Sequence, residues 1–595
     1  MYNLNIEALL QAYKSNDLEP KTLIKELRQQ ALDQAEYHAW ITLLTEQELD
    51  QYLSKLDGES PDTLPLYGVP FAIKDNIDLA NVPTTCACPD FAYTPDKNAF
   101  VVQQLLDAGA IPLGKTNLDQ FATGLVGVRS PYGQGKNTFN PDYISGGSSA
   151  GSAISTALGQ VSFALGTDTA GSGRVPAAIN NLVGHKPTFG LFSASGLVPA
   201  CRTLDCITVF ALNTQDAALV TSIAGQYDHE DAYARKNTHD NQLRYFSPNT
   251  PKSFTFAVPK QLEFCENPET ETLFLQAVEK LESLGGEKVD VDFTPFLDAA
   301  KLLYEGPWVA ERWLATKDVK AESMLPVINT IVSGAEKFTA ADAFSYQYKL
   351  QAYKKMCDEI VKSVDILVTP TCPTYFTREQ LSQEPIKYNS IMGTYTNFMN
   401  LLDYTATAVP VGFTQSGLSW GVTLFSDRFT DMKVLSYAGG LHQAFNLPQG
   451  TSDYPLQPFT KPSVPAISNT IDVLVCGAHL TGQPLNWQLV ERGAQLKSQT
   501  TSAPSYELYA LPDGKRPGMI RSNSDLARAI EVEVWTMPME NFGSFVAGIP
   551  EPLGIGKVEL ADGSWVCGFM CEGSAIAASK NITEYGSWLN WLASR

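Results

Sequence analysis

Basic residues, histidines and long apolar runs are all scarce in this chain of 595 residues. Its 43 lysines and arginines stand against 64 aspartates and glutamates, so the formal net charge is −21. Because contact with nucleic-acid phosphates requires a basic surface, this balance argues against a nucleic-acid binder. It also means that an anionic substrate would need a local cation in order to bind.

No apolar run reaches the length of a membrane span. The first residues, MYNLNIEALLQAYKSND, have neither the basic n-region nor the apolar h-region of a secretory signal. The composition, with 44% hydrophobic and 18% charged residues, is typical of a globular protein, and the length provides for more than one domain. We therefore expect a cytoplasmic protein that has no membrane partner.

The ten cysteines are scattered, and their two close pairs do not make a zinc site. Cys86 and Cys88 are separated by one residue, and Cys567 and Cys571 by three, but neither pair has a second half at a suitable spacing. We expect free thiols in a reducing compartment and no bound metal.

Glycine, serine and alanine crowd the stretch from Ile144 to Gly190. Apolar blocks at 153–158 and 161–165 interrupt it, so it differs from a flexible linker and predicts a turn, a buried helix and strand, and a second turn. Ser148 and Ser172 head the two turns, 24 residues apart. A serine in such a turn is a candidate nucleophile, because neighbouring backbone N–H groups are placed to bind an oxyanion.

Three segments together resemble one enzyme family: LYGVPFAIKDN at 66–76, GGSSAGS at 146–152 and GTDTAGSGRVPAA at 166–178. They are similar to the amidase signature family of serine hydrolases, and the similarity covers roughly residues 60–440. The resemblance implies that Lys74 is the general base, that Ser148 is a relay serine after a cis peptide bond, and that Ser172 is the nucleophile.

A lysine base is consistent with the scarcity of histidine. An unaided serine hydroxyl needs an adjacent base, which is usually histidine, but the chain has six histidines and only His185 lies within the motif. We expect His185 to be a packing residue. Burial must lower the pKa of Lys74 from its free value of about 10.4 so that the amine can accept a proton.

The resemblance also implies an oxyanion hole formed by the backbone N–H groups of Thr169, Ala170, Gly171 and Ser172. The family more often has glycine where Ala170 stands, which points to a subfamily. Asp168 and Arg174 flank this turn. We expect them to brace the loop as an ion pair and to take no part in the chemistry.

The segment LLYEGPWVAER, residues 302–312, indicates the subfamily. It is similar to the allophanate hydrolase branch, as is the stretch TDTAGSGRVPAAINNLVG at 167–184. The resemblance implies that Tyr304 and Arg312 bind a substrate carboxylate, since arginine can bind a carboxylate through two parallel hydrogen bonds. Without the resemblance, a core tyrosine and a surface arginine would be the simpler interpretation. Gly124, in a polar loop, is expected to offer its backbone to the substrate.

Alternation of strand and helix patterns predicts an α/β fold, a mixed β-sheet covered by helices, over residues 1–455. Residues 1–56 are predicted to be helical. A proline-rich linker at 456–468 then precedes a small α+β, barrel-like domain at 469–595. This domain resembles the γ-glutamylcyclotransferase-like fold, which places His479 and Asn486 after its first strand as candidate site residues. An equally favoured alternative is that His479 only makes hydrogen bonds that stabilise the turn.

Taken together, we expect hydrolysis of a small anionic substrate, allophanate (urea-1-carboxylate), to ammonia and carbon dioxide, without a cofactor. The C-terminal domain would aid decarboxylation of the product, N-carboxycarbamate. The resemblance further implies a homodimer and a biotin-dependent urea carboxylase on a separate chain as functional partner. Two alternatives stay open: another amidase acting on an apolar or peptide amide, and a non-catalytic scaffold subunit.

Overall fold

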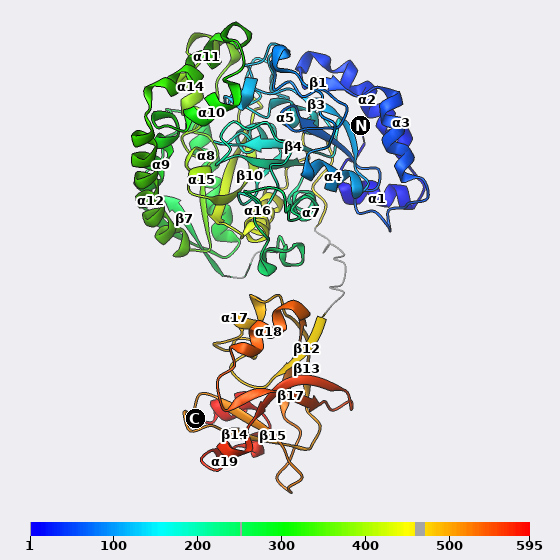
Figure 1. The fold of residues 1–595 in the computed structure, drawn as a ribbon, viewed down its shortest axis with the longest axis vertical. Helices are drawn as coiled ribbons and strands as arrows, with labels where there is room; N and C mark the ends of the chain where they lie inside the picture. The colour runs from blue at the N-terminus through cyan, green and yellow to red at the C-terminus, as the bar shows by residue number, and fades with distance from the viewer. Residues whose placement is uncertain (1, 250, 252, 459–469) are drawn as a thin grey trace. The chain divides into compact units, whose positions relative to one another are not determined.

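The computed structural model describes residues 2–249, 251, 253–458 and 470–595. Contacts between Cα atoms divide the chain into two compact units, one of residues 1–237 and 241–462 and the other of residues 238–240 and 463–595 (Figure 1). The predicted linker at 456–468 lies for the most part outside the described residues, so its boundaries stay a prediction.

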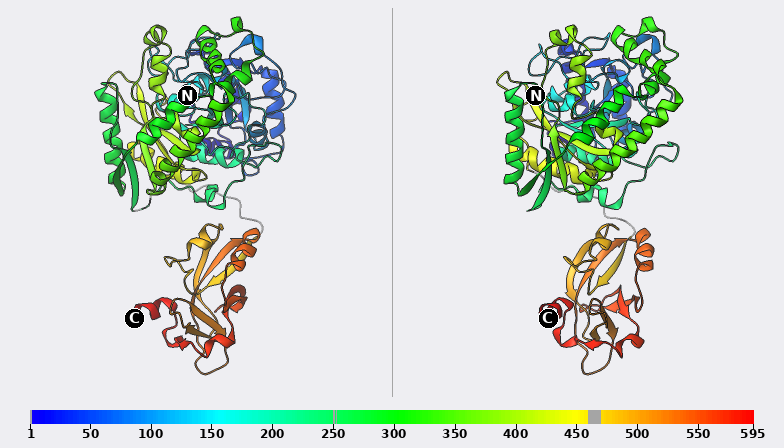
Figure 2. Two further views of the ribbon diagram at one scale, coloured as in Figure 1. Left: turned by 60° about the vertical axis from the view of Figure 1, so that its left-hand side comes forward. Right: turned by 90° about the vertical axis from the view of Figure 1, so that its left-hand side faces the viewer.

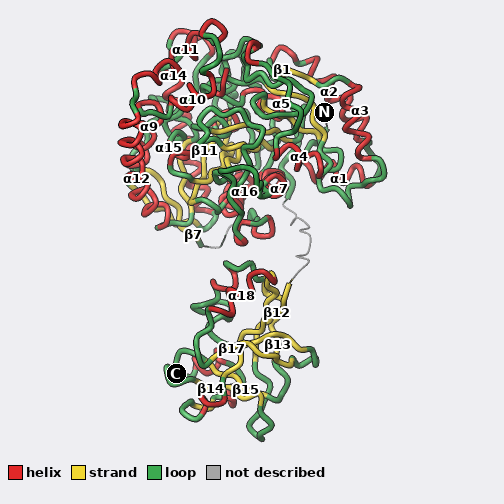
Figure 3. The backbone as a smooth tube through the Cα atoms, in the orientation of Figure 1, coloured by secondary structure: helices red, strands yellow, loops and turns green. Residues whose placement is uncertain are grey.

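The N-terminal unit is built on one mixed sheet of eleven strands among the described residues. The strands, in their order across the sheet, are β1 (Trp40–Leu43), β3 (Ile111–Thr116), β2 (Pro70–Lys74), β4 (Phe163–Asp168), β6 (Cys206–Ala211), β5 (Val183–Lys186), β10 (Tyr404–Phe413), β11 (Ser419–Asp427), β9 (Ile366–Pro370), β7 (Phe254–Pro259) and β8 (Gly286–Val291). Strands lie in the interior and helices outside them (Figure 3), which confirms the expected α/β class.

The N-terminal helices cover one end of this sheet. They are α1 (Ile6–Lys14), α2 (Pro20–Asp33) and α3 (Glu46–Leu53), and Pro20 occupies the first position of α2, where a missing N–H costs nothing. Within the segment predicted to be helical, strand β1 is the exception. Four residues are too few to show a period, and β1 is held by antiparallel pairing with β3, a contact that local sequence does not reveal.

Strand β2 carries Lys74 into the middle of the unit. All five of its residues, PFAIK, are buried, because parallel neighbours β3 and β4 flank it on both sides. The rings of Phe71 and Phe163 stack across β2 and β4 with their centroids 5.3 Å apart. Parallel β2 and β4 therefore end at the same edge, where Lys74 and Asp168 meet the glycine-rich turns.

The glycine-rich stretch forms the elements that its pattern predicts. Helix α5 (Ala150–Ala157) is buried over its whole length, strand β4 follows it, and the short helix α6 (Val175–Ala178) follows the second turn. In Figure 1, helices α1, α2 and α3 lie at one side of the sheet, and α9 (Thr294–Glu305) and α12 (Ala340–Lys362) lie at the other.

The C-terminal unit has its own hydrophobic core and two sheets (Figure 2). The larger sheet has the order β13 (Gln495–Thr501), β16 (Glu531–Pro538), β12 (Thr470–Val475), β18 (Trp565–Cys571) and β17 (Leu553–Glu559); the smaller has β15 (Pro517–Arg521), β14 (Tyr506–Ala510) and β19 (Lys580–Asn581). Helices α17 (Trp487–Val490), α18 (Met539–Ala547), α19 (Gly573–Ile576) and α20 (Trp588–Ala593) complete a mixed α+β unit. Across the described parts of the chain, no helix combines the length and the hydropathy needed to cross a membrane.

Candidate active site

Lys74 is completely enclosed at the end of β2, with 0% of its surface exposed. Its side-chain nitrogen Nζ donates to three hydroxyl oxygens: Ser148 Oγ at 2.7 Å, Ser149 Oγ at 3.0 Å and Thr167 Oγ1 at 2.7 Å. The peptide bond between Gly147 and Ser148 is cis, as the resemblance implies for the relay serine. The amine is therefore fixed against the hydroxyl with which it is expected to exchange a proton.

Burial has a direct effect on the charge of this amine. Removal from water lowers the pKa of Lys74 to about 7, although the carboxylates of Asp119, Asp205 and Asp168 act in the opposite direction. A lysine with this pKa is partly neutral near pH 7 and is able to act as a general base.

Ser172 lies in the turn after β4, with 3% of its surface exposed. Its hydroxyl donates to the backbone carbonyl of Gly124 over 3.3 Å. Among the described residues, no hydrogen bond joins Ser172 to Ser148. The direct contact between the two serines that proton relay needs is therefore not formed in this structure. Such contacts are often long in an enzyme without substrate and shorten when the substrate binds.

A buried ion pair shapes the turn that carries Ser172. Arg174 Nε donates to Asp168 Oδ2 at 2.9 Å and its Nη2 donates to Oδ1 at 3.0 Å, which confirms the expected pairing. The same carboxylate accepts the backbone N–H groups of Gly171 and Gly173 at 2.8 and 3.0 Å. These bonds offset the cost of burial and hold the pKa of Asp168 below its usual value. Gly171, at φ 130°, has a backbone conformation that other residues rarely adopt.

His185 is a packing residue, as expected. It lies on β5 with 0% exposure, and its ring nitrogens lie 2.9 Å from Thr407 Oγ1 and 3.5 Å from Asp431 Oδ1.

The polar loop 119–129 forms a wall beside Ser172. Its fold depends on Asp119, whose carboxylate accepts the backbone N–H groups of Val126, Gly127 and Arg129 at 3.1, 3.0 and 2.9 Å. The carbonyl of Gly124, which we expected to face the substrate, is thereby held against the Ser172 hydroxyl.

Arg312 reaches this loop from helix α10 (Val309–Thr316). Its Nη1 donates to Thr123 Oγ1 at 3.0 Å and, more weakly, to the Ala122 carbonyl at 3.4 Å. Only 4% of its surface is exposed, and within the described residues no carboxylate lies within the 4.0 Å of an ion pair. Burial alone would lower the pKa of Arg312, but its neighbours Cys201, Tyr304 and Asp205 raise it above its usual value, so the guanidinium stays charged.

Tyr304 lies at the C-terminal end of α9, before the break at Gly306, as the sequence predicts. The residue is 38% exposed, in contrast to buried Arg312, and the two side chains are close enough for Tyr304 to influence the pKa of Arg312. An arginine and a tyrosine in this relation suit the binding of a carboxylate.

Sequence reasoning missed three polar residues at this site. Ser149 and Thr167 supply two of the three acceptors of Lys74, and Arg129 is a second buried guanidinium, 3% exposed, in the 119–129 loop. Ser149 and Thr167 lie inside the quoted motifs. Their closeness in sequence to the catalytic candidates could therefore have identified them as site residues.

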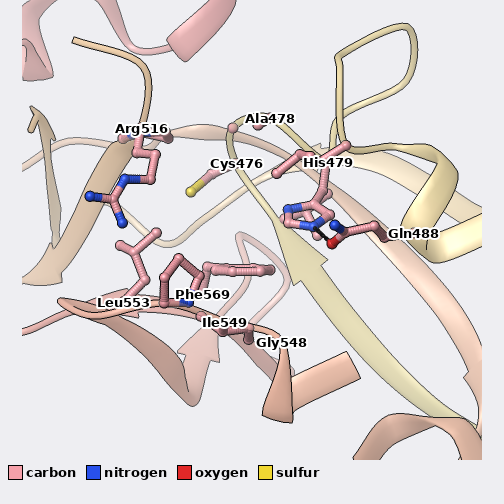
Figure 4. A pocket seen from close by; sticks show the side chains of 14 residues that line it. Cys476, Ala478, His479, Gln488, Arg516, Gly548, Ile549, Leu553 and Phe569 are labelled. Atoms are coloured by element: carbon pink, nitrogen blue, oxygen red, sulfur yellow. Dashed lines mark hydrogen bonds between the residues drawn. The ribbon is translucent and has the colours of Figure 1, made fainter. Parts of the chain in front are cut away.

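A cavity of about 250 Å³ lies in the C-terminal unit at the end of β12 (Figure 4). Its polar lining comes from His479, Gln488 and Arg516, and most of the remaining wall is apolar: Val475, Leu485, Pro517, Ile549, Pro550, Leu553 and Phe569. In Figure 4 the His479 ring turns toward Gln488, and Arg516 stands at the other side of the cavity.

His479 is fixed within this cavity. Its Nε2 lies 3.0 Å from Gln488 Oε1, and its ring stacks on Phe569 with centroids 5.1 Å apart. Burial lowers the pKa of His479, so the ring is predominantly neutral at pH 7. Asn486 does not line the cavity; its side chain donates to the His479 carbonyl at 2.8 Å and thus braces the turn.

Two family models match the chain. The amidase model covers residues 23–435, and the model of the allophanate hydrolase C-terminal domain covers residues 471–593. A urea amidolyase of Saccharomyces cerevisiae is 46% identical over 574 residues, which is 93% of this chain but 31% of that protein, so the chain spans about a third of this relative. A glutamyl-tRNA(Gln) amidotransferase chain from Lawsonia intracellularis is 31% identical, over 71% of this chain and 93% of that one.

A solved structure of Kluyveromyces lactis allophanate hydrolase superposes with a TM-score of 0.81 at 42% identity. The match covers 98% of this chain and 99% of that one, so both units have counterparts there. The chain belongs to the amidase family of hydrolases and carries an allophanate hydrolase C-terminal domain.

Proposed function

We propose that this chain hydrolyses allophanate, releasing ammonia and, in the end, carbon dioxide. The observation that carries the proposal is the match to an allophanate hydrolase along nearly the whole of both chains, at 42% identity. A lysine base with a pKa of about 7 and a buried arginine that has no carboxylate partner among the described residues provide the chemistry that an anionic amide needs.

In this mechanism Ser148 passes its proton to neutral Lys74 and takes the proton of Ser172. Ser172 Oγ attacks the terminal carboxamide carbon, and the backbone N–H groups of Thr169, Ala170 and Ser172 stabilise the negative oxygen. The N–H of Gly171, which the resemblance also implied, instead donates to Asp168 Oδ1 at 2.8 Å, so it is not available to the oxyanion. The C–N bond breaks, and its electrons and the relayed proton leave as ammonia. Water then attacks the acyl group by the same relay and releases N-carboxycarbamate and free Ser172.

Arg312 and Tyr304 are proposed to hold the substrate carboxylate. Arg312 is buried, charged and free of an ion-pair partner within the described residues, so a bound carboxylate would neutralise it. Gly124 would position the reacting amide through its backbone carbonyl, which already accepts from Ser172. A neutral amidase would gain nothing from a buried guanidinium at this place.

The C-terminal cavity is proposed to aid decarboxylation of N-carboxycarbamate. That step needs one proton: the nitrogen takes it, the adjacent C–N bond breaks with its electrons going to nitrogen, and carbon dioxide leaves. Water supplies the proton, His479 is the candidate side chain that orients it as a neutral ring, and Arg516, which also pairs with Asp513, offers a cation for the carboxylate that stays. The small volume and largely apolar wall suit a compact anion that loses charge.

We further propose a functional link to a biotin-dependent urea carboxylase that supplies allophanate. The urea amidolyase relative, of which this chain covers 31%, supports the link. A carboxylase on a separate chain, a homodimer and a cytoplasmic location stay predictions.

The experiment is ammonia release by the purified chain from allophanate, with acetamide as the neutral comparison and the Ser172→Ala variant as blank. We expect rapid release from allophanate alone. Activity on acetamide but not on allophanate would keep the Lys74–Ser148–Ser172 chemistry and reject the substrate. No activity on either would favour the scaffold alternative.

A further inference from the structure

Arg129 is a buried cation that the mechanism above does not use. It belongs to the loop 119–129, which carries Gly124, and only 3% of its surface is exposed. Its Nη1 donates to the Thr123 carbonyl at 2.9 Å and its Nη2 to the Pro385 carbonyl at 2.6 Å. Among the described residues, its Nε has no hydrogen-bond partner and no carboxylate lies within ion-pair distance of its guanidinium.

Two guanidinium groups thus donate hydrogen bonds to the same residue, Thr123, which precedes Gly124. Arg129 binds the carbonyl of Thr123, and Arg312 binds its hydroxyl at 3.0 Å. A Cβ added to Gly124 would lie 3.2 Å from Cδ of Arg129, so the arginine stem packs against the residue whose carbonyl accepts from Ser172. Arg129 is therefore in the wall of the amide site.

The positive charges of Arg129 and Arg312 favour the binding of an anion near them. Two buried cations that repel one another are costly unless an opposite charge joins them. Arg312 and Tyr304 both influence the ionisation of Arg129, which places all three in one electrostatic environment. Burial lowers the pKa of Arg129 and the carboxylate of Asp119 raises it, but Asp119 accepts three backbone N–H groups of the loop and, among the described residues, forms no ion pair with the guanidinium.

We propose that Arg129 is a second cationic specificity residue of the amide site, which acts with Arg312 to favour a carboxylate-bearing substrate over a neutral one of the same shape. The inference rests on the proposed function and deepens it. Arg129 acts through its charge and through the placement of Thr123 and Gly124, so its test must separate these two effects.

Biuret is the appropriate neutral probe, because it differs from allophanate by an amide in place of the carboxylate. We would measure kcat/KM for both compounds with the wild type, Arg129→Gln and Arg129→Lys. Arg521→Gln, which removes the same charge from an exposed arginine of the C-terminal unit, is the matched control. Thermal unfolding of each variant checks that it is folded.

We expect Arg129→Gln to lower the ratio of kcat/KM for allophanate to that for biuret by roughly tenfold or more, the size of one nearby charge in a partly buried site. Arg129→Lys keeps the charge and should recover most of the ratio even if both rates fall. Arg521→Gln should leave it unchanged.

A merely structural role predicts that both substrates lose activity equally and that the ratio stays at its wild-type value; that result would overturn the inference. The same holds if Arg129→Lys lowers the ratio as far as Arg129→Gln does. A wild-type protein that is inactive on allophanate would instead reject the proposed function, so the two failures are distinguishable.

Discussion

The pH dependence of activity follows from the burial of Lys74. With a pKa of about 7, the neutral amine amounts to about 10% of Lys74 at pH 6, 50% at pH 7 and 90% at pH 8. An ordinary lysine would be neutral to about 0.04% at pH 7. Because only the neutral form accepts a proton, kcat/KM should rise about tenfold per pH unit below about pH 6, about fivefold between pH 6 and 7, and level off above about pH 8.

Asp205 provides a perturbation with a definite sign. Its carboxylate favours the charged form of Lys74, and it accepts the Thr169 hydroxyl and the backbone N–H of Ala200 and Cys201. The Asp205→Asn variant removes the charge and keeps an acceptor oxygen. The pKa of Lys74 should fall, so the rise of kcat/KM should move to lower pH.

The assay is the initial rate of ammonia release from allophanate between about pH 5.5 and 9, with Ser172→Ala subtracted at each pH. Burial also raises the pKa of Asp205 to about 6, so the wild-type profile should depart from a single titration near that value and the Asp205→Asn profile should not. A flat wild-type profile between pH 6 and 8, an inflection near 10, or a shift of the Asp205→Asn rise to higher pH would refute the reasoning about Lys74.

Three further variants test single contacts. Arg312→Gln should raise KM for allophanate and change kcat less, because the lost contact exists before and during reaction; an unchanged KM would remove Arg312 from substrate binding. Asp168→Asn leaves buried Arg174 unpaired and should lower the free energy of unfolding of the N-terminal unit by about 3–5 kcal/mol, measured with denaturant. The control Asp62→Asn breaks an exposed pair with Lys14 and should lower it by less than about 1 kcal/mol. Equal effects of the two variants would contradict the bracing role of Asp168. Gly171→Ala places a Cβ 2.3 Å from Thr396 Oγ1 at φ 130°, so ammonia release should be lost, and retained activity would show that the turn is adaptable.

The sequence was sufficient to identify the amidase motifs and the strands and helices that carry them. Lys74 ends an otherwise apolar strand, and Ser148 and Ser172 head glycine-dense turns, so local patterns mark all three. The class of each element follows from such patterns because burial on both faces of β2 or along α5 leaves a continuous run of apolar and small residues.

What escaped prediction depends on contacts between distant segments. Strand β1 forms because it pairs with β3. Arg129 is buried because it packs against Gly124 and donates a hydrogen bond to the carbonyl of Pro385, 256 positions away in the sequence. A lone arginine in a polar loop carries no sign of burial. Asn486 is the opposite case. Its position after a strand predicted a site residue, but its side chain donates a hydrogen bond to the carbonyl of His479.

The most direct test of the central claim is the rate of ammonia release from allophanate by Ser172→Ala, measured beside its thermal unfolding. The Ser172 hydroxyl donates one long hydrogen bond, at 3.3 Å, so its loss should leave unfolding unchanged. We expect a fall in kcat of at least about 10³-fold, as for other nucleophilic serines. A folded variant that retains a substantial fraction of wild-type activity would contradict it.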